Sequence, residues 1–577
     1  MIPEKIYTLL GLLVLSAVGI LPVLPSFSRL RKLESPVIRF TERKTFAVWV
    51  LFFAVIGVRL MVLPAFKTPV PGVQDEYSYL LLSDTFAHGR LTNPTHPLWV
   101  SFESMDINWT PTYNSMYPPA QGFFLAIGQL MGHPWIGVLL SNAAMCAAIV
   151  WMLQVWIPAR WAFLAGVITA LQFSVTSYWI NSYWGGAVAA TGGALVLGAV
   201  GRIRRHAMWQ GSLVLGMGIA ILANSRPFEG MVFCIPTAIY FLWWMVGKIK
   251  TRDTLRARTV QVFLPLLACM LLLGSFMAYY NWRLTGNPLL LPHVQYTNTY
   301  YSARSFLWQG LNPPLHYHNA QFEGLFNGWA RNYYHKSWAD AGRLTKEKFE
   351  MFGSYFFSPA EWLLLPMVPF LFRDRRIRFL LTTLVVGMLG VFMLVWGHPH
   401  YAAPLVCVVI TLLVQTMRHL NTIEIKGRRL GALLVRVVVI TMFAATLDRV
   451  LDRTCDEGLR RCWKNIERAE IADELNSMPG KHLVMVRYYK NHDYHFEWVY
   501  NGADIDSAKI LWARELDAAQ NERLLAYFKD RQIWLMRPDE IDPKVRQLKP
   551  YLRAASQPQA LISAQASTGN ALPSVTP

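Results

Sequence analysis

Apolar runs of membrane-spanning length recur along most of the chain, separated by shorter polar segments. A bilayer core about 30 Å thick takes roughly 20 residues of helix, and several runs approach that length. The pattern therefore predicts an all-α polytopic membrane protein with about 12 transmembrane helices. The predicted spans lie near residues 6–26, 46–65, 134–157, 161–179, 185–200, 211–223, 229–247, 259–280, 359–372, 379–396, 401–417 and 431–447.

The first run, about Ile6 to Pro25, resembles the apolar part of a signal peptide. A cleaved leader needs a small-residue site after that part, but the chain continues with "SFSRLRKL". We therefore expect a retained span, with the N-terminus outside. Residues 1–45 would then comprise this span and a basic cytoplasmic loop.

Clusters of Lys and Arg set the expected orientation. The formal net charge of +19 is typical of nucleic-acid binders, yet 53% of the residues are hydrophobic and only 16% are charged. The basic residues lie in short loops between apolar runs, where they favour the cytoplasmic side, so we exclude nucleic acid as a partner. These clusters occupy residues 29–44, 202–206, 248–258, 373–378 and 426–429.

Two long loops within the region 46–447 are predicted to lie outside. In residues 66–133, acids outnumber bases before the segment Pro118 to Gly132. That segment is short for a span and would break the alternation of sides, so we expect a helix at the outer interface. The second loop, residues 281–358, is rich in aromatic and turn residues.

After the last apolar run, acids and bases approach balance, as in a water-soluble unit. "HLVMVRYY" and "RQIWLM" favour strands, and "NERLLAYFKD" between them favours a helix. Residues 448–553 are therefore predicted to form a small α/β periplasmic domain. The tail 554–577, rich in Ser, Ala, Gln and Pro, is expected to be disordered.

The cysteines divide into two groups. Those in apolar runs are expected to be core residues: Cys146, Cys234, Cys269 and Cys407. Cys455 and Cys462 lie in the outer region, where an oxidising compartment permits a disulfide. On one continuous helix their α-carbons would be too far apart to bridge, although Gly458 offers a break. Both alternatives stay open.

"VQDEYSYLLLSDTFAHGRL" predicts a short amphipathic helix over residues 75–87, with Gly89 placed to stop it. Successive helix positions lie about 100° apart, so Asp75 and Glu76 are no automatic chelating pair. One interpretation makes Asp75 the N-cap of the helix. The other makes it a carboxylate just outside the membrane that takes a proton from an attacking hydroxyl.

Other residues of the first outer loop have simpler interpretations. Trp99, Trp109 and Tyr113 are expected to be interfacial anchors. His88 and His96 are weak candidates for metal ligands, because no matched ligand cluster accompanies them.

A carboxylate that acts on a substrate with an anionic head needs cations nearby. One outer turn, "NSRPFEG", offers Arg226 and Glu229, which alternatively pair only with each other. Another, "GHPHY", offers His398 and His400, which alternatively are solvated imidazoles of a Pro-bearing turn. The loop 281–358 adds Arg304, Arg331 and Lys336.

Four elements occur in a recognisable order: "DEYSYLLLSDTFAHGRL", "YPPAQGFFLAIGQLMG", "GSLVLGMGIAILANSRPFEG" and "GHPHYAAPL". With this order the chain resembles the GT-C glycosyltransferases of the protein O-mannosyltransferase and aminoarabinose-transferase type. The likeness covers about residues 46–417. The sequence departs from that pattern where the usual Lys of the tight turn is replaced by "SRPFE".

The resemblance implies an inverting transferase in the bacterial cytoplasmic (inner) membrane, with the C-terminal domain in the periplasm. A polyprenyl-phosphate-linked sugar would be its donor, and a hydroxyl or amine of a lipid, glycan or protein its acceptor. Asp75 matches the catalytic carboxylate, with Glu76 beside it. Substrate-binding candidates are Arg226 for the lipid phosphate, then Glu229, His398, His400, Tyr401, His96, Tyr117 and Arg331.

No resident cofactor is expected besides the lipid-linked donor and membrane lipids, and a divalent metal stays open. The alternative is a transporter or lipid flippase, which predicts ionisable residues near span centres. Most spans have none; Arg59 and Arg436 are the exceptions. The sequence has no internal repeat, which also weakens that alternative. A non-catalytic scaffold would predict that Asp75→Asn leaves function intact.

Overall fold

The computed structural model describes residues 36 and 38–551, apart from 248–250, 358, 376, 426–428, 453–464, 491 and 542–546. Three predictions fall outside the described residues: the first span, the Cys455–Cys462 disulfide and the tail 554–577. Of the other cysteines, Cys146 and Cys407 are buried, as expected of core residues. Cys234 and Cys269 are only partly buried.

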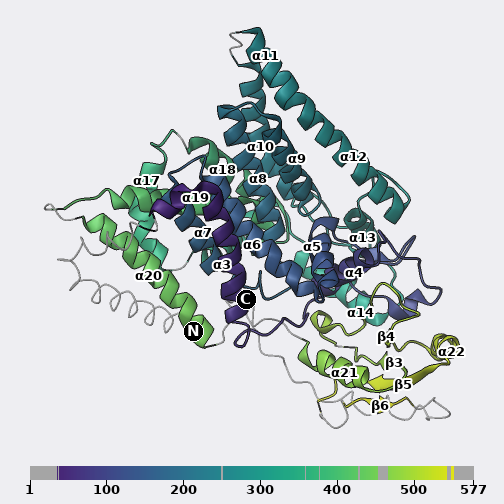
Figure 1. Ribbon diagram of the computed structural model, residues 1–577. Helices are drawn as coiled ribbons and strands as arrows, with labels where there is room; N and C mark the ends of the chain where they lie inside the picture. Colours follow the sequence, from purple (N-terminus) through teal and green to yellow (C-terminus); the bar gives the residue numbers. More distant parts are fainter. Residues whose placement is uncertain are drawn as a thin grey trace.

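A bundle of helices forms most of the described chain (Figure 1). Every predicted span after the first coincides with helical structure. The bounds are α3 Lys44–Met61, α6 Pro134–Leu153, α7 Ala159–Phe173, α8 Ala187–Arg205, α9 Trp209–Ala223, α10 Pro227–Val246, α11 Arg252–Arg258, η3 Thr259–Phe263, α12 Leu264–Thr285, η6 Pro359–Met367, α17 Val368–Leu371, α18 Arg378–Met393, η7 Pro399–Leu405, α19 Val406–Asn421 and α20 Leu430–Leu451.

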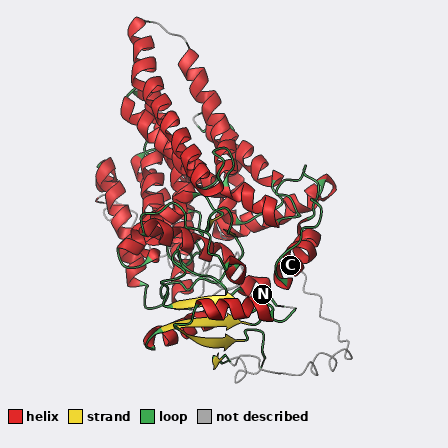
Figure 2. Cartoon of the chain, turned by 90° about the vertical axis from the view of Figure 1, so that its right-hand side faces the viewer, coloured by secondary structure: helices red, strands yellow, loops and turns green. Residues whose placement is uncertain are grey.

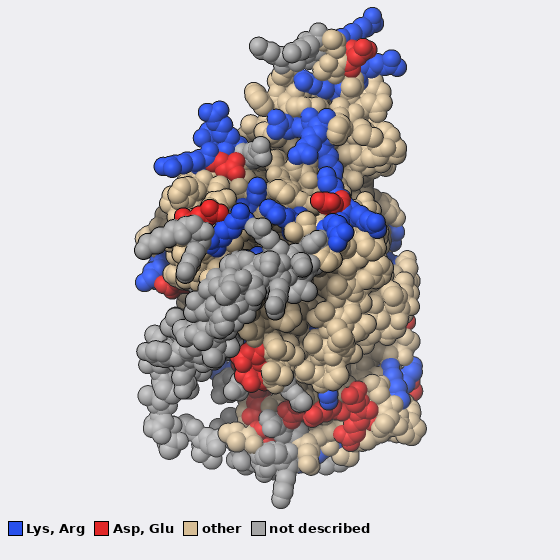
Figure 3. Space-filling view, turned by 60° about the vertical axis from the view of Figure 1, so that its left-hand side comes forward, with Lys and Arg blue, Asp and Glu red and all other residues tan. Residues whose placement is uncertain are grey.

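Within the described ranges, seven helical segments are long and apolar enough to cross a membrane: α3, α6, α8, α10, Arg252–Thr285, Pro399–Asn421 and α20. Shorter apolar helices include α7, α9 and α18. A polytopic helical fold is therefore confirmed, while the count of 12 spans stays a prediction. Figure 3 shows most of the visible Lys and Arg over the upper part of one face and a group of Asp and Glu near its lower end.

Small residues let the central helices approach closely. A Cβ added at Gly218 of α9 would lie 2.9 Å from the backbone nitrogen of Val196 and 3.0 Å from the carbonyl of Gly192, both in α8. Such contacts are typical of helices packed within a membrane. They fix α9 against α8 and so position the turn that follows α9.

The segments 66–133 and 281–358 form further helices and the two-stranded antiparallel β1-β2 pair, and Figure 1 shows α4 and α5 beside the bundle. The predicted helix at Pro118–Gly132 is present as α5. The bounds are α4 Gln74–Ala87, η2 Trp99–Phe102, β1 Ile107–Asn108, β2 Asn114–Ser115, α5 Pro119–Leu130, α13 Pro292–Tyr300, α14 Ala320–Phe322, η4 Glu323–Ala330, α15 Arg331–Tyr334, η5 Trp338–Asp340 and α16 Ala341–Phe356.

The residues after the bundle form an α/β unit whose sheet lies at one end of the molecule (Figure 2). Its strand order is β4-β3-β5-β6, with β3 parallel to β4 and β5, and β6 antiparallel to β5. The two predicted strands and the predicted helix are confirmed. The bounds are α21 Ile466–Ser477, β3 Lys481–Val486, η8 Tyr494–Phe496, β4 Ile510–Arg514, α22 Ala518–Tyr527, β5 Arg531–Met536 and β6 Lys549–Pro550.

The α/β unit and the first outer loop share one hydrophobic core. Tyr77, Phe102 and Trp109 of the loop cluster with Leu483 and Leu511 of the sheet. The rings of Tyr77 and Tyr500 stack with centroids 4.2 Å apart. The C-terminal unit is thus packed directly against the loop that carries Asp75.

This shared core corrects the prediction of interfacial anchors. Trp109 and Tyr113 are only 2% and 1% exposed, and Trp99 packs against the same cluster. Side chains buried by a distant part of the chain do not anchor at a lipid surface. The amphipathic rings of Trp and Tyr suit both a membrane interface and a protein core, so the sequence alone did not distinguish these two environments.

Candidate active site

Helix α4 presents its two acids to different surroundings. The N-cap is Val73, so Asp75 lies within the first turn and the N-cap interpretation of Asp75 is wrong. Glu76 accepts hydrogen bonds from the backbone N–H groups of Gly72 (2.8 Å) and Val73 (3.3 Å), and from that of Tyr183 (2.9 Å). Burial raises the pKa of Glu76 to about 7, against these backbone donors, which lower it. Glu76 therefore fixes the start of α4.

Asp75 faces a tyrosine instead. The phenolic oxygen of Tyr117 donates to Asp75 Oδ1 and lies 3.4 Å from Asp106 Oδ2. The Tyr117 ring stacks on Tyr79 with centroids 4.4 Å apart. Asp75 is only partly buried, whereas Asp106 is 4% exposed. A half-exposed carboxylate and a buried one thus flank a single hydroxyl.

Close packing of α5 on α4 creates this contact. A Cβ added at Gly122 would lie 2.3 Å from Cγ of Leu82, so only glycine fits there. Pro119 occupies the first turn of α5, which suits the fixed φ of proline. Tyr117 immediately precedes this start and is therefore held beside the first turn of α4.

Asp106 was counted from the sequence only as one of the loop acids. Its backbone has φ of 60°, and among the described residues it is the one non-glycine residue with a positive φ. Its N–H donates to Tyr296 Oη at 2.7 Å, and its carbonyl accepts from Ser78 Oγ at 2.6 Å. Burial and the charge of Asp75 raise the pKa of Asp106 well above its ordinary value. Burial therefore disfavours a second negative charge beside Asp75.

Arg226 lies on the same end of the bundle. It occupies the N-cap position of α10 without a side-chain capping bond, and its guanidinium carbon lies 4.6 Å from the ring centroid of Tyr401. Its Nη1 is 4.0 Å from Glu229 Oε1. The turn is joined to the start of α5, because the N–H of Ala120 donates to the carbonyl of Asn224 at 2.8 Å.

Three tyrosines lie around the two charged groups. Tyr117 donates to Asp75 and stacks on Tyr79, while Tyr401 lies under Arg226. Both charges reach Tyr79: burial raises the pKa of Tyr79, the charge of Arg226 lowers it and that of Asp75 raises it. We call Asp75, Asp106, Arg226 and these tyrosines the acid–arginine cluster.

The "GHPHY" turn borders this cluster. Its Tyr401 lies under Arg226, while His400 is 2% exposed and its Nδ1 lies 3.0 Å from Tyr178 Oη. The ring of Trp184 lies 4.8 Å from that of His400 and 5.6 Å from that of His398. Both imidazoles pack against aromatic rings, but only His400 is buried, while His398 is partly exposed. Tyr401 brings this turn to the cluster.

Two predicted substrate-binding residues contact other parts of the molecule. His96 Nε2 lies 3.3 Å from Asp506 Oδ1, and its ring stacks on Phe528, both in the C-terminal unit. Arg331 donates to the carbonyl of Asn312 at 2.7 Å, within the loop 281–358. Neither contact involves the acid–arginine cluster. Over the described ranges, no group of three or more His, Cys, Asp or Glu residues is arranged to hold a metal ion.

No protein-family model and no curated protein matches the chain. Among solved structures, ArnT from Cupriavidus metallidurans in the apo state is 12% identical, with a TM-score of 0.46, covering 86% of this chain and 93% of that one. ArnT from the same organism bound to undecaprenyl phosphate is also 12% identical, with a TM-score of 0.45, and the match covers 84% of this chain and 92% of that one.

An oligosaccharyltransferase from Archaeoglobus fulgidus, tethered to an acceptor peptide, is 11% identical with a TM-score of 0.45. The match covers 79% of this chain and 63% of that chain's length. These neighbours are GT-C glycosyltransferases, the family that the sequence motifs resemble. At these scores the likeness assigns no substrate, and the function must be argued from the chain's own residues.

Proposed function

We propose that the protein transfers a sugar from a polyprenyl-phosphate-linked donor to an acceptor hydroxyl or amine at the outer face of the bacterial inner membrane, inverting the anomeric centre. The observation that carries this proposal is that Asp75 accepts from Tyr117, that Tyr117 stacks on Tyr79, and that the charges of Asp75 and Arg226 both reach Tyr79. A base for the acceptor and a cation for the lipid phosphate are the groups that this reaction requires.

In the proposed reaction, Asp75 takes the proton from the acceptor as its oxygen or nitrogen attacks the anomeric carbon. The bond between that carbon and the phosphate oxygen breaks, and the electron pair leaves with the prenyl phosphate. Arg226 offsets the charge that gathers on the departing phosphate. The hydrogen bond from Tyr117 orients the Asp75 carboxylate. Burial favours the protonated form of Asp106, so that Asp75 is the base of the pair.

The prenyl tail needs an apolar path that begins near Arg226. Helix α10 starts next to Arg226, and an apolar groove of about 340 Å³ lies between α10 and α18. Ile235 and Ile239 of α10 and Phe379 of α18 are among its lining residues. Ile235 is nine positions beyond Arg226, roughly 13 Å along a helix at 1.5 Å per residue. A tail attached to a phosphate at Arg226 would reach this groove.

The transporter or flippase alternative is less well supported. A transporter would use Arg59 in its transport path. Arg59 is instead fully buried at the end of α3. It donates to the carbonyl of Phe66 at 3.0 Å and to Asn181 Oδ1 at 2.8 Å. These bonds tie the end of α3 to the outer loops. Arg436 donates to the carbonyl of Ala432 within its own helix.

The experiment is an incorporation assay in membrane vesicles with a panel of radiolabelled polyprenyl-phosphate hexoses and pentoses. We expect one donor to label a lipid, glycan or protein product in vesicles that carry the wild-type chain. Asp75→Asn, and Arg226→Ala combined with Glu229→Gln, should strongly reduce the labelling, while Glu350→Gln, which alters an exposed acid, should leave it unchanged. Wild-type vesicles that label no product from any donor would refute the proposed function.

A further inference from the structure

The C-terminal α/β unit has no role in the reaction as proposed so far. We infer that this unit is part of the active-site scaffold and that Arg514 is a positioning residue, which clamps the two outer loops around the acid–arginine cluster. The inference rests on the proposed function for its effect on catalysis. The contacts that carry it do not depend on that function.

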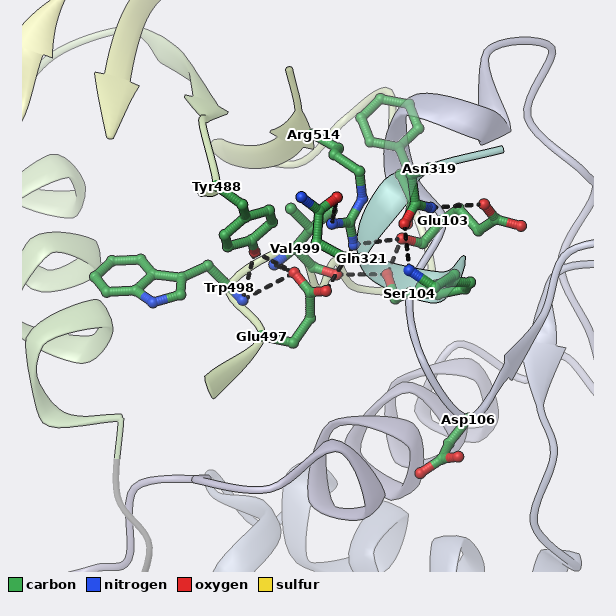
Figure 4. A network of polar contacts seen from close by, with 12 residues as sticks. Glu103, Ser104, Asp106, Asn319, Gln321, Tyr488, Glu497, Trp498, Val499 and Arg514 are labelled. Carbon is green, nitrogen blue, oxygen red and sulfur yellow. Dashed lines mark hydrogen bonds and ion pairs between the residues drawn. The ribbon is translucent and has the colours of Figure 1, made fainter. Parts of the chain in front are cut away.

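Arg514 is the last residue of β4 and is 1% exposed. Its Nη2 donates to Glu497 Oε2 at 2.6 Å and to the carbonyl of Glu103 at 3.2 Å. Its Nη1 donates to Gln321 Oε1 at 3.3 Å. Figure 4 shows the guanidinium between these groups. One side chain thus joins the C-terminal unit, the first outer loop and the loop 281–358.

Glu103 is a second link between the first outer loop and the loop 281–358. Its side chain is 1% exposed. Its carboxylate accepts from Tyr300 Oη at 2.9 Å and from Asn319 Nδ2 at 3.0 Å, and lies 3.3 Å from His318 Nδ1. A buried carboxylate with three such partners is strongly fixed in place. The backbone of Glu103 is held by Arg514, so both ends of this residue are fixed.

From Glu103 the chain runs directly to Asp106. Ser104 Oγ donates to the carbonyl of Val499, a second bond to the C-terminal unit (Figure 4). Asp106 follows with its left-handed backbone and its carboxylate beside Tyr117. Such a conformation in a non-glycine residue persists when its surroundings over-determine it. The bonds at Glu103 and Ser104 are part of those surroundings.

The guanidinium of Arg514 is well suited to hold several groups at once. A guanidinium presents several donors in one plane, so it serves a carboxylate and a carbonyl at once, whereas a lysine ammonium is a point charge. Burial alone would raise the pKa of Glu497, but Arg514, His492 and the hydroxyl of Tyr488 together hold that pKa below its ordinary value. The pair is therefore ionised, and removing Arg514 alone would leave a buried, uncompensated charge.

The test measures hydrogen exchange and initial transfer rates of the full chain in nanodiscs. Arg514→Met combined with Glu497→Gln removes the clamp without leaving a buried charge. We expect faster exchange in residues 100–117 and 315–327, unchanged exchange in α8, and at least a tenfold fall in kcat with donor KM nearly unchanged. Arg514→Lys should recover part of both effects. Arg523→Met, on the exposed face of α22, should behave as wild type.

Two outcomes would overturn the inference: wild-type exchange in residues 100–117 in the double variant, or faster exchange there with an unchanged kcat. If the double variant does not fold, Ser104→Ala takes its place, because it removes only the bonds of one hydroxyl. Wild-type exchange in residues 100–117 of that variant would equally contradict the clamp. If the wild type makes no product from any donor, the proposed function fails, while the exchange data still decide whether the clamp exists.

Discussion

The hydroxyl of Tyr117 donates a hydrogen bond to Asp75, although 42 positions separate the two residues. The contact links the start of α5 to the first turn of α4. It orients one oxygen of the Asp75 carboxylate. The acceptor-activating base of the proposed reaction is therefore held by a bond from the neighbouring helix.

Tyr117→Phe should slow transfer without unfolding the protein. The substitution removes the hydrogen bond to Asp75 but keeps the ring that stacks on Tyr79. A hydrogen bond to a charged group is worth about 1.5–3 kcal/mol, so kcat should fall roughly 10- to 100-fold. Initial rates at saturating donor measure this. A wild-type rate would show that the bond does not orient the base.

Glu76→Gln should affect stability more than catalysis. Glu76 accepts three backbone hydrogen bonds, and a glutamine amide cannot accept with both of its terminal atoms. We expect a loss of about 1–3 kcal/mol in the free energy of unfolding, with most of the transfer rate kept by the folded protein. Thermal unfolding and rate assays on the same preparation test this. If the Glu76→Gln variant were inactive but as stable as the wild type, Glu76 would have a catalytic role.

Arg226 should act mainly on the donor phosphate. Glu229, its ion-pair partner, is buried, so Arg226→Ala is best combined with Glu229→Gln to avoid a lone buried carboxylate. Losing a charge-assisted contact should weaken donor binding roughly 10- to 100-fold. Arg226→Lys should keep part of it, because a point charge remains. Donor KM is the readout, with Arg343→Ala at an exposed site as the control.

Docking of the loop 281–358 onto the first outer loop should depend on pH. The hydrogen bond to Glu103 raises the pKa of His318 above its ordinary 6.5. The histidine therefore stabilises the docked loop fully below pH 6.5, and this contribution is lost as pH rises through the raised pKa. We expect exchange in residues 315–322, corrected for intrinsic rates, to increase across that range. His318→Gln should remove this pH dependence, and a variant that keeps it would exclude His318 as its source.

Local patterns in the sequence predicted much of the fold. Apolar runs located the helices of the described bundle, and the strand and helix signals of the C-terminal unit were correct. The alternation of sides also predicted Asp75, Arg226, Tyr117 and Tyr401 at one end of the bundle. These features depend on short windows or on the alternation of sides, which a single sequence contains.

Contacts between distant segments were not predictable in the same way. Trp109 looks like an interfacial ring until the sheet that buries it is in place, and His96 looks like a ligand until Asp506 lies beside it. Asp106 has no sequence signal beyond the tolerance of Asp for a left-handed backbone. Arg514 and Glu103 are 411 positions apart, so no local pattern links them.

In the proposed reaction, Asp75 is the base in a transfer from a prenyl-phosphate sugar. The initial rate of product formation by Asp75→Asn, with the donor that wild-type vesicles accept, tests this role. We expect the rate to fall roughly 10²- to 10⁴-fold, the usual contribution of a general base, while the unfolding temperature stays unchanged. Product formation at the wild-type rate by this variant would contradict the role of Asp75 as the base.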